Sequence, residues 1–141
     1  SEEQKRLIPS TQDEEGKMQI ISSLSHMRDV RCREARAFII VGGKTKGSLT
    51  PIPGILEEYL KARATKKPIY LLGGFGGEAA LISKSVISRE TIIKSIQDDT
   101  YESLNNGLNK EENMRLLLST NVFEIIRLII SGMKKVIKPK E

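Results

Sequence analysis

Hydrophobic residues in this chain fall into short continuous runs and longer spaced stripes, which predict strands and helices respectively. Two runs of β-forming residues cover positions 37–41 and 68–72, and glycines follow each run directly. A continuous apolar run is typical of a strand buried on both faces of a parallel sheet. A shorter apolar stretch over residues 18–21 predicts an edge strand.

Helices are predicted between and after these strands. The first starts at Ser22 and Ser23, which can cap a helix, and ends near Ala35. Apolar residues at helical spacing predict the others over residues 55–64, 78–85, 89–101, 111–118 and 121–136. Strands that alternate with helices over short connections are typical of a parallel α/β sheet.

We therefore expect an α/β fold with a Rossmann-like, three-layer parallel sheet of two or three strands, helices on both faces, and a helical C-terminal part. So few strands indicate that the opening βαβ unit is absent. The chain begins with Ser, so we expect a processed product or part of a larger protein. We divide it into a flexible lead-in with the edge strand at 1–22, a partial domain at 23–136 and a basic tail at 137–141.

Composition allows one hydrophobic core and excludes a disulfide-stabilised fold and a usual zinc site. A chain of 141 residues that is 38% hydrophobic has enough material for one core. The single cysteine, Cys32, excludes a disulfide framework and favours a reducing, cytoplasmic location. The single histidine, His26, leaves too few ligands for a usual zinc site, so we expect no metal.

The charge indicates anionic partners. There are 23 Lys and Arg against 18 Asp and Glu, a net charge of +5, but most of the excess lies in the last eight residues. Only 4% of the residues are aromatic and no nucleic-acid motif occurs, which disfavours a nucleic-acid partner.

The longest apolar run, residues 122–133, is interrupted by Glu124 and Arg127 and is too short to span a membrane.

Glycines gather where ligand binding is expected. Both predicted strands end in glycine clusters, and the carboxyl edge of an open α/β sheet is where ligands bind. Glycine allows close approach of a phosphate to backbone amides, and Lys44 and Lys46 follow the first cluster. Tight strand-to-helix turns are the alternative explanation. Neither cluster is a Walker A sequence or a G-x-G-x-x-G motif.

Two acids follow Pro53-Gly54 at the start of the next predicted helix. Glu57 and Glu58 suit the helix dipole there without any ligand. A carboxylate at this edge could also accept hydrogen bonds from ribose hydroxyls or act as a glycosidic nucleophile. The two side chains flank the apolar stripe on opposite sides, so helical phase does not choose between them.

Four residues of the first predicted helix do not by themselves indicate a functional site. Met27 is expected on the apolar face of its helix and Arg28 in solvent beside it. His26 is expected at the surface or at a cap, and Cys32 as a small buried residue. Neither has an evident nucleophile–base partner.

The strings SLSHMRDVRCREARAFIIVGGKTKG, PIPGILEEYLKA and KKPIYLLGGFGGEAA, taken together, resemble the later half of a SLOG domain. That superfamily is related to the lonely-guy phosphoribohydrolases, the nucleoside deoxyribosyltransferases and the amino-terminal region of TRPM channels. The resemblance covers residues 23–82, and the string NVFEIIRLIISGM also resembles the segment after the glycine clusters in such chains.

The resemblance implies a Rossmann-like domain that binds nucleotides or their sugar derivatives. Some members are sensors in bacterial anti-phage defence, which recognise NAD-derived signals such as cyclic ADP-ribose isomers and regulate an attached effector. By motif, Arg28 and Lys44 would meet phosphate and Glu57 or Glu58 would meet ribose. The ligand-binding residues so predicted are Arg28, Gly42, Gly43, Lys44, Gly54, Glu57, Glu58, Gly73, Gly74, Phe75, Gly76 and Gly77.

Two departures from the family pattern favour binding over catalysis. The usual first strand and its loop are not recognisable in residues 1–22, and the chain has no GGxGT element like that of the enzymatic relatives. We therefore expect a sensor domain for an NAD-derived or ADP-ribose-like ligand, with no cofactor or chemistry of its own. The alternatives are an N-glycosidase or nucleoside ribosyl-transfer enzyme that uses Glu57 or Glu58, and a purely structural domain.

The expected partners are the nucleotide ligand and either an effector domain or a second copy of the chain. A small sheet leaves an apolar edge to cover, which favours a homo-oligomer.

Overall fold

The computed structural model describes residues 14–45 and 52–137, and its elements follow the predicted order over most of that range. The regular elements are α2 (Glu14–Glu34), β1 (Phe38–Val41), α3 (Gly54–Ala64), β2 (Ile69–Leu72), α4 (Gly77–Val86), the 3-10 helices η1 (Lys94–Ile96) and η2 (Tyr101–Leu104), α5 (Lys110–Leu118) and α6 (Val122–Val136). The described part is mostly helical, with a small parallel sheet.

The two strands pair in parallel, with Phe38 beside Ile69 and Val41 beside Leu72. The crossover between them is α3, as an α/β unit requires. This confirms an incomplete α/β fold. The predicted Rossmann-like, three-layer arrangement with two or three strands stays a prediction, because the described residues form a sheet of two strands.

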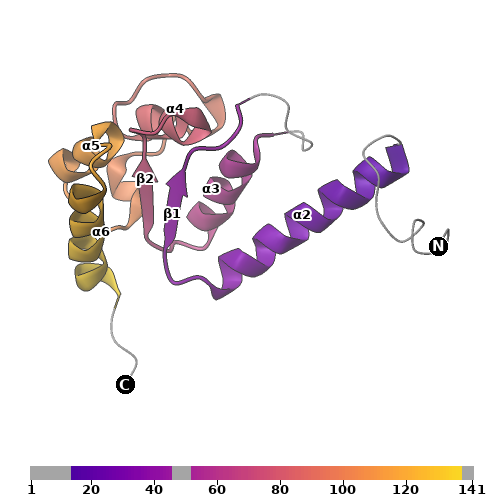
Figure 1. Cartoon of the computed structure of the whole chain (residues 1–141), viewed down its shortest axis with the longest axis horizontal. Helices are drawn as coiled ribbons and strands as arrows, with labels where there is room; N and C mark the ends of the chain where they lie inside the picture. The colour runs from indigo at the N-terminus through magenta and orange to yellow at the C-terminus, as the bar shows by residue number, and fades with distance from the viewer. Residues whose placement is uncertain (1–13, 46–51, 138–141) are drawn as a thin grey trace.

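Helices lie on both faces of the sheet (Figure 1). Phe38, Ile40, Ile69 and Leu71 form one core cluster with side chains that include those of α3 and α4. Tyr70 and Leu72, on the opposite face, form a second cluster with residues of α5 and α6. Because side chains alternate along a strand, each strand can contribute to both clusters.

The prediction that both strands are buried on both faces is right for β2 and wrong for β1. All four residues of β2 are buried, whereas Ile39 is 50% exposed and Val41 is 43% exposed. The cause is packing rather than composition, since α5 and α6 cover the β2 side of that face and leave β1 open.

Two other predicted elements differ in the structure. Residues 18–21 lie inside α2 rather than in an edge strand, and that helix starts eight residues before Ser22. Residues 89–101 form no continuous helix but a loop with short 3-10 turns, because Arg89 adopts a left-handed backbone with φ of 60°. Residues 1–13 of the predicted lead-in and residues 138–141 of the predicted tail lie outside the described range.

The C-terminal helices start where asparagine caps them. The Asn109 side chain accepts a hydrogen bond from the Glu112 amide at 2.8 Å, and the Asn121 side chain accepts one from the Glu124 amide at 3.2 Å. A buried amide network holds the preceding turn to the sheet. The Nδ2 of Asn106 donates to the Ile69 carbonyl at 2.9 Å and to Asn113 Oδ1 at 2.8 Å.

Candidate functional site

The two glycine turns meet at the carboxyl edge of the sheet. The carbonyls of Gly42 and Gly43 accept hydrogen bonds from the amides of Ala79 and Glu78, at 2.9 Å and 3.1 Å. Gly77, with φ of 70°, lies so close that a Cβ there would come within 2.6 Å of the Gly43 carbonyl oxygen. The structure therefore places the turn after β1 directly against the start of α4.

This contact changes which amides could face a ligand. The amides of Glu78 and Ala79 are occupied by the first turn, and those of Gly73 and Gly76 donate to the carbonyls of Leu116 and Gly73. In the described part of the chain, the amides of Gly74, Phe75 and Gly77 donate to no other protein group. Only part of the second glycine cluster is thus open to an anion.

Gly73 and Gly74 pack against the end of α5. A Cβ on Gly73 would lie 2.6 Å from the Leu117 carbonyl oxygen, and one on Gly74 would lie 2.1 Å from that of Ser119. Their small size is therefore explained by packing. Phe75, between the glycines, is about half exposed.

The first turn of α3 joins this edge to α2. Gly43 lies against Ile55, where a Cβ would approach Ile55 Cγ1 to 2.4 Å. On the other side, Gly54 lies beneath the Arg28 guanidinium, and a Cβ on Gly54 would lie 2.3 Å from Arg28 Nη2. Arg28 and the glycine turns therefore share one region, although Arg28 comes from a different helix.

Arg28 belongs to a network of charges between α2 and α3. Its Nη1 donates to Glu57 Oε2 at 3.1 Å, and both side chains are mostly buried. The Lys61 ammonium lies 3.0 Å from the other Glu57 oxygen and 2.7 Å from Asp29 Oδ1. It also donates to the Ser25 carbonyl at 2.9 Å. Two cations therefore share the Glu57 carboxylate.

The surroundings keep Glu57 ionised. Burial acts to raise its pKa, but hydrogen bonding and charge from Lys61, together with the charge of Arg28, outweigh burial and hold the pKa below its usual range. A carboxylate in this state accepts hydrogen bonds and does not donate them.

The structure separates the two candidate acids. Glu57 faces α2 and pairs with Arg28, whereas Glu58 lines a groove at the open edge of β1 with Ile39 and Ala35. Glu57 is therefore the acid that the structure brings to the predicted phosphate-binding residue. Lys44 is exposed and leads into residues 46–51, which lie outside the described range.

Several residues of this region carried no clear signal in the sequence. Lys61 is one helical turn after Glu57, a spacing that could have indicated the pair. Asp29 and Arg28 are contributed by α2, and Arg28 was expected in solvent rather than buried. Glu78 is buried in the first turn of α4 close to Gly43, and burial raises its pKa.

His26 and Cys32 lie beside this network. They line a groove of about 460 Å³ between α2 and α3, together with Asp29 and Lys61. Burial raises the pKa of the Cys32 thiol. Among the residues that the structure describes, no three His, Cys, Asp or Glu side chains gather as metal ligands would.

This arrangement suits an anionic ligand that also carries hydroxyl groups. Arg28 can present a guanidinium to phosphate, Glu57 can accept from hydroxyls, and the open amides of the second turn can donate to oxygen.

Within residues 14–45 and 52–137, every helix is too short or too polar to cross a bilayer.

Comparison with known proteins identifies one family. A family model described as SLOG cluster2 matches residues 1–87, which is more than half of the chain and includes β1, β2 and every predicted ligand-binding residue. No curated protein and no solved structure matches the chain.

Proposed function

Because the chain belongs to the SLOG family, we propose that it binds a nucleotide-derived ligand of the NAD or ADP-ribose class where its glycine turns meet α3. We further propose that binding regulates an attached effector, as in anti-phage defence. The family supports a nucleotide-related domain. The observation that carries the ligand class is the buried pair of Arg28 and Glu57 over Gly54, beside the joined turns.

The chemistry of the pair matches a sugar phosphate. A guanidinium binds phosphate with two parallel hydrogen bonds, which an ammonium cannot form. An ionised carboxylate accepts hydrogen bonds from ribose hydroxyls. Since Glu57 has two cationic neighbours, Arg28 can turn to a phosphate while Lys61 continues to balance the carboxylate.

The same charges favour binding over catalysis. Two cationic nitrogens lie 3.1 Å and 3.0 Å from the two Glu57 oxygens and withdraw electron density from the carboxylate, which makes it a weaker nucleophile. A carboxylate has about four acceptor positions, so these two contacts leave positions that can accept a hydrogen bond from a hydroxyl. We therefore favour a sensor over the N-glycosidase.

Isothermal titration calorimetry with ADP-ribose and its cyclic isomers tests the proposal. We expect binding by the chain, a loss of at least about tenfold in affinity for Arg28→Ala and a smaller loss for Arg28→Lys. Lys44→Ala should also weaken binding, and more so at low salt than at high salt. Arg115→Ala, which removes an exposed arginine from α5, is the matched control.

Two results would overturn the proposal. One is that neither ADP-ribose nor a cyclic isomer binds the folded chain. The other is that Arg28→Ala binds as tightly as the unaltered protein and the Arg115→Ala control.

Product analysis distinguishes a sensor without chemistry of its own from an N-glycosidase. The protein is incubated with NAD, AMP and deoxynucleosides, and the mixture is separated by chromatography. We expect unchanged substrates. Release of free base, abolished by Glu57→Gln and kept by Glu58→Gln, would establish glycosidase chemistry instead.

A further inference from the structure

Half of one sheet face has no cover in the described part of the chain. Tyr70 and Leu72 lie beneath α5 and α6, and Ala37, just before β1, packs against the same cluster. Ile39 and Val41 point to that face too, because they alternate with the oppositely buried Phe38 and Ile40. They lie beside Tyr70 and Leu72 in the sheet register but stay about half exposed.

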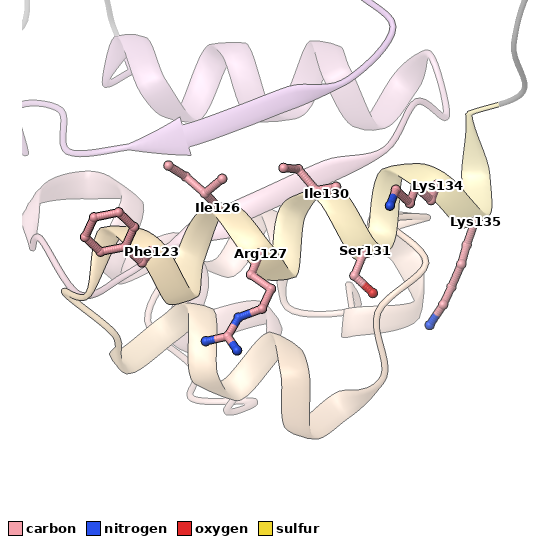
Figure 2. Close-up of a pocket in the computed structure, with 7 residues that line it drawn as sticks. All are labelled: Phe123, Ile126, Arg127, Ile130, Ser131, Lys134 and Lys135. Atoms are coloured by element: carbon pink, nitrogen blue, oxygen red, sulfur yellow. The ribbon is translucent and has the colours of Figure 1, made fainter.

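Helix α6 presents a second apolar stripe next to this open half. Its buried residues include Ile125, Leu128 and Ile129, yet Phe123 is 84% exposed and Ile126 and Ile130 are about half exposed. Figure 2 shows Ile126 and Ile130 pointing from α6 toward the side on which β1 runs. A groove of about 590 Å³ follows the stripe. We call Ile39, Val41, Phe123, Ile126 and Ile130 the α6–β1 surface.

We propose that a second copy of this chain covers the α6–β1 surface. In this arrangement, the α6 of each copy lies antiparallel beside the α6 of the other and over the Ile39 and Val41 of its partner. Ile126 and Ile130 point toward the side on which β1 runs, where Ile39 and Val41 are about half exposed. We infer that one helix of the partner can pack against both parts of the surface.

Charge along α6 favours its own antiparallel copy. The first turn contains Glu124 and the last turn contains Lys134 and Lys135. Antiparallel pairing brings each acid toward the bases of the other copy and opposes the two helix dipoles. A parallel pair would place the bases together. Ile126 and Ile130 lie near the middle of the helix, so a two-fold axis there matches each with the other.

Interface size also favours a reciprocal contact. A stable protein interface buries roughly 800 Å² on each partner, more than one exposed helical stripe supplies. A two-fold operation buries the stripe and the strand face of both copies at once. The isoleucines and Phe123 would form the desolvated centre, with Arg127 and the lysines at the rim.

Sedimentation velocity over a wide concentration range tests the proposal. We expect a dimer for the unaltered chain and a shift of at least about a hundredfold toward monomer for Ile126→Glu, Ile130→Glu and Ile39→Glu, because each buries a charge at the contact. Ile92→Glu is the matched control, since Ile92 is similarly exposed but lies outside the surface. Thermal melts confirm that each variant folds.

Cross-linking tests the arrangement itself. In a Cys32→Ala background, Ile39→Cys and Ile126→Cys proteins are mixed and treated with a short bismaleimide. We expect a cross-link between the two different proteins and none in Ile39→Cys alone. A monomer at every concentration would overturn the proposal. So would a dimer that the three glutamate variants leave intact, or one in which the mixture does not cross-link.

Discussion

At the scale of single residues, the charge around Glu57 decides what the start of α3 can bind. One carboxylate lies between the guanidinium of Arg28 and the ammonium of Lys61, and Asp29 balances Lys61 from α2. The two carboxylates therefore balance the two cations, so Arg28 and Glu57 can stay mostly buried without a ligand. A phosphate that enters would meet an arginine that is already oriented by Glu57 and supported by Gly54.

Glu57→Gln should destabilise the protein at neutral pH, because it leaves two mostly buried cations with less compensation. We expect a loss of about 1–2 kcal/mol in unfolding free energy at pH 7. The pKa of Glu57 is lower in the folded state than its usual value of 4.5. Its stabilisation is therefore present above that value and is lost as the pH falls through the lower, folded-state pKa.

Thermal melts of both proteins between about pH 7 and pH 3 check this, and the difference between them should close on acidification. Glu58→Gln, one residue along the same helix, is the control and should melt like the unaltered chain. Equal losses in the two variants would contradict the placement of Glu57 between the cations.

Tyr59 makes a second residue-level test. It is fully buried, and its hydroxyl donates to Asp99 Oδ2 at 2.7 Å, while Arg63 Nε donates to the same oxygen at 3.2 Å. Burial and the Asp99 charge raise the Tyr59 pKa far above its usual value, so the hydroxyl stays protonated. Tyr59→Phe should cost about 1.5–3 kcal/mol of stability, the range for a hydrogen bond to a charged group.

Urea denaturation measures this cost. Tyr101→Phe, on a partly exposed tyrosine, is the control and should change stability by less than about 0.5 kcal/mol. If both variants unfold at the same urea concentration, the Tyr59–Asp99 bond contributes nothing to the fold.

At the scale of elements, the start of α4 depends on a glycine that nothing larger can replace. Gly77 has φ of 70°, and a Cβ there would meet the carbonyl of Gly43 at 2.6 Å and the carbonyl carbon of Gly42 at 2.7 Å. Gly77→Ala must therefore separate the two glycine turns. We expect a loss of about 2–4 kcal/mol in stability, from strain and from the displaced backbone together.

Gly76→Ala separates these two causes. Gly76 has φ of 76° and ψ of −156°, a backbone conformation that essentially only glycine adopts, but a Cβ there would have no other atom within 4 Å. The variant should therefore lose about 1–3 kcal/mol from backbone strain alone. Calorimetric melting of both variants gives the comparison. A cost for Gly77→Ala no greater than that for Gly76→Ala would show that the turns are not in contact in solution.

The predicted elements were right where local chemistry marks their ends. Glycines follow both strands and asparagines precede α5 and α6, and these elements appear within about one residue of prediction. The stretch at 18–21 was wrong because a strand needs a partner, and these residues instead continue a helix from Glu14. The helix at 89–101 was wrong because apolar spacing does not reveal the left-handed backbone of Arg89.

The candidate site was also predictable only in part: the meeting of the two glycine turns could be predicted, and the choice between the two acids could not. Adjacent strand ends placed the two glycine turns together, as the contacts between Gly43 and Gly77 show. Helical phase could not choose between Glu57 and Glu58, because the choice depends on where α2 docks and hence on Arg28, 29 residues away in sequence. The use of the Glu78 and Ala79 amides by the first turn depends equally on tertiary packing.

At the scale of the whole molecule, the two strands show how far burial departs from composition. The run FIIV is entirely apolar and IYLL contains a tyrosine, yet all of β2 is buried and alternate residues of β1 are open. What differs is the neighbour: α6 lies over β2 and presents isoleucines beside β1. No pattern within residues 37–41 carries that information, because the covering helix comes from the other end of the chain.

Association through the α6–β1 surface has a thermodynamic consequence for the whole chain. Because only the folded state dimerises, mass action should raise the melting temperature by about 3–6 °C for each hundredfold increase in protein concentration. Differential scanning calorimetry at several concentrations measures this dependence, and Ile126→Glu should abolish it. Arg28→Ala, which lies at the ligand site, should keep the concentration dependence and lose the added stabilisation by ADP-ribose. The two variants thus separate assembly from ligand binding, and an Ile126→Glu protein that still melts at a higher temperature when concentrated would contradict the dimer.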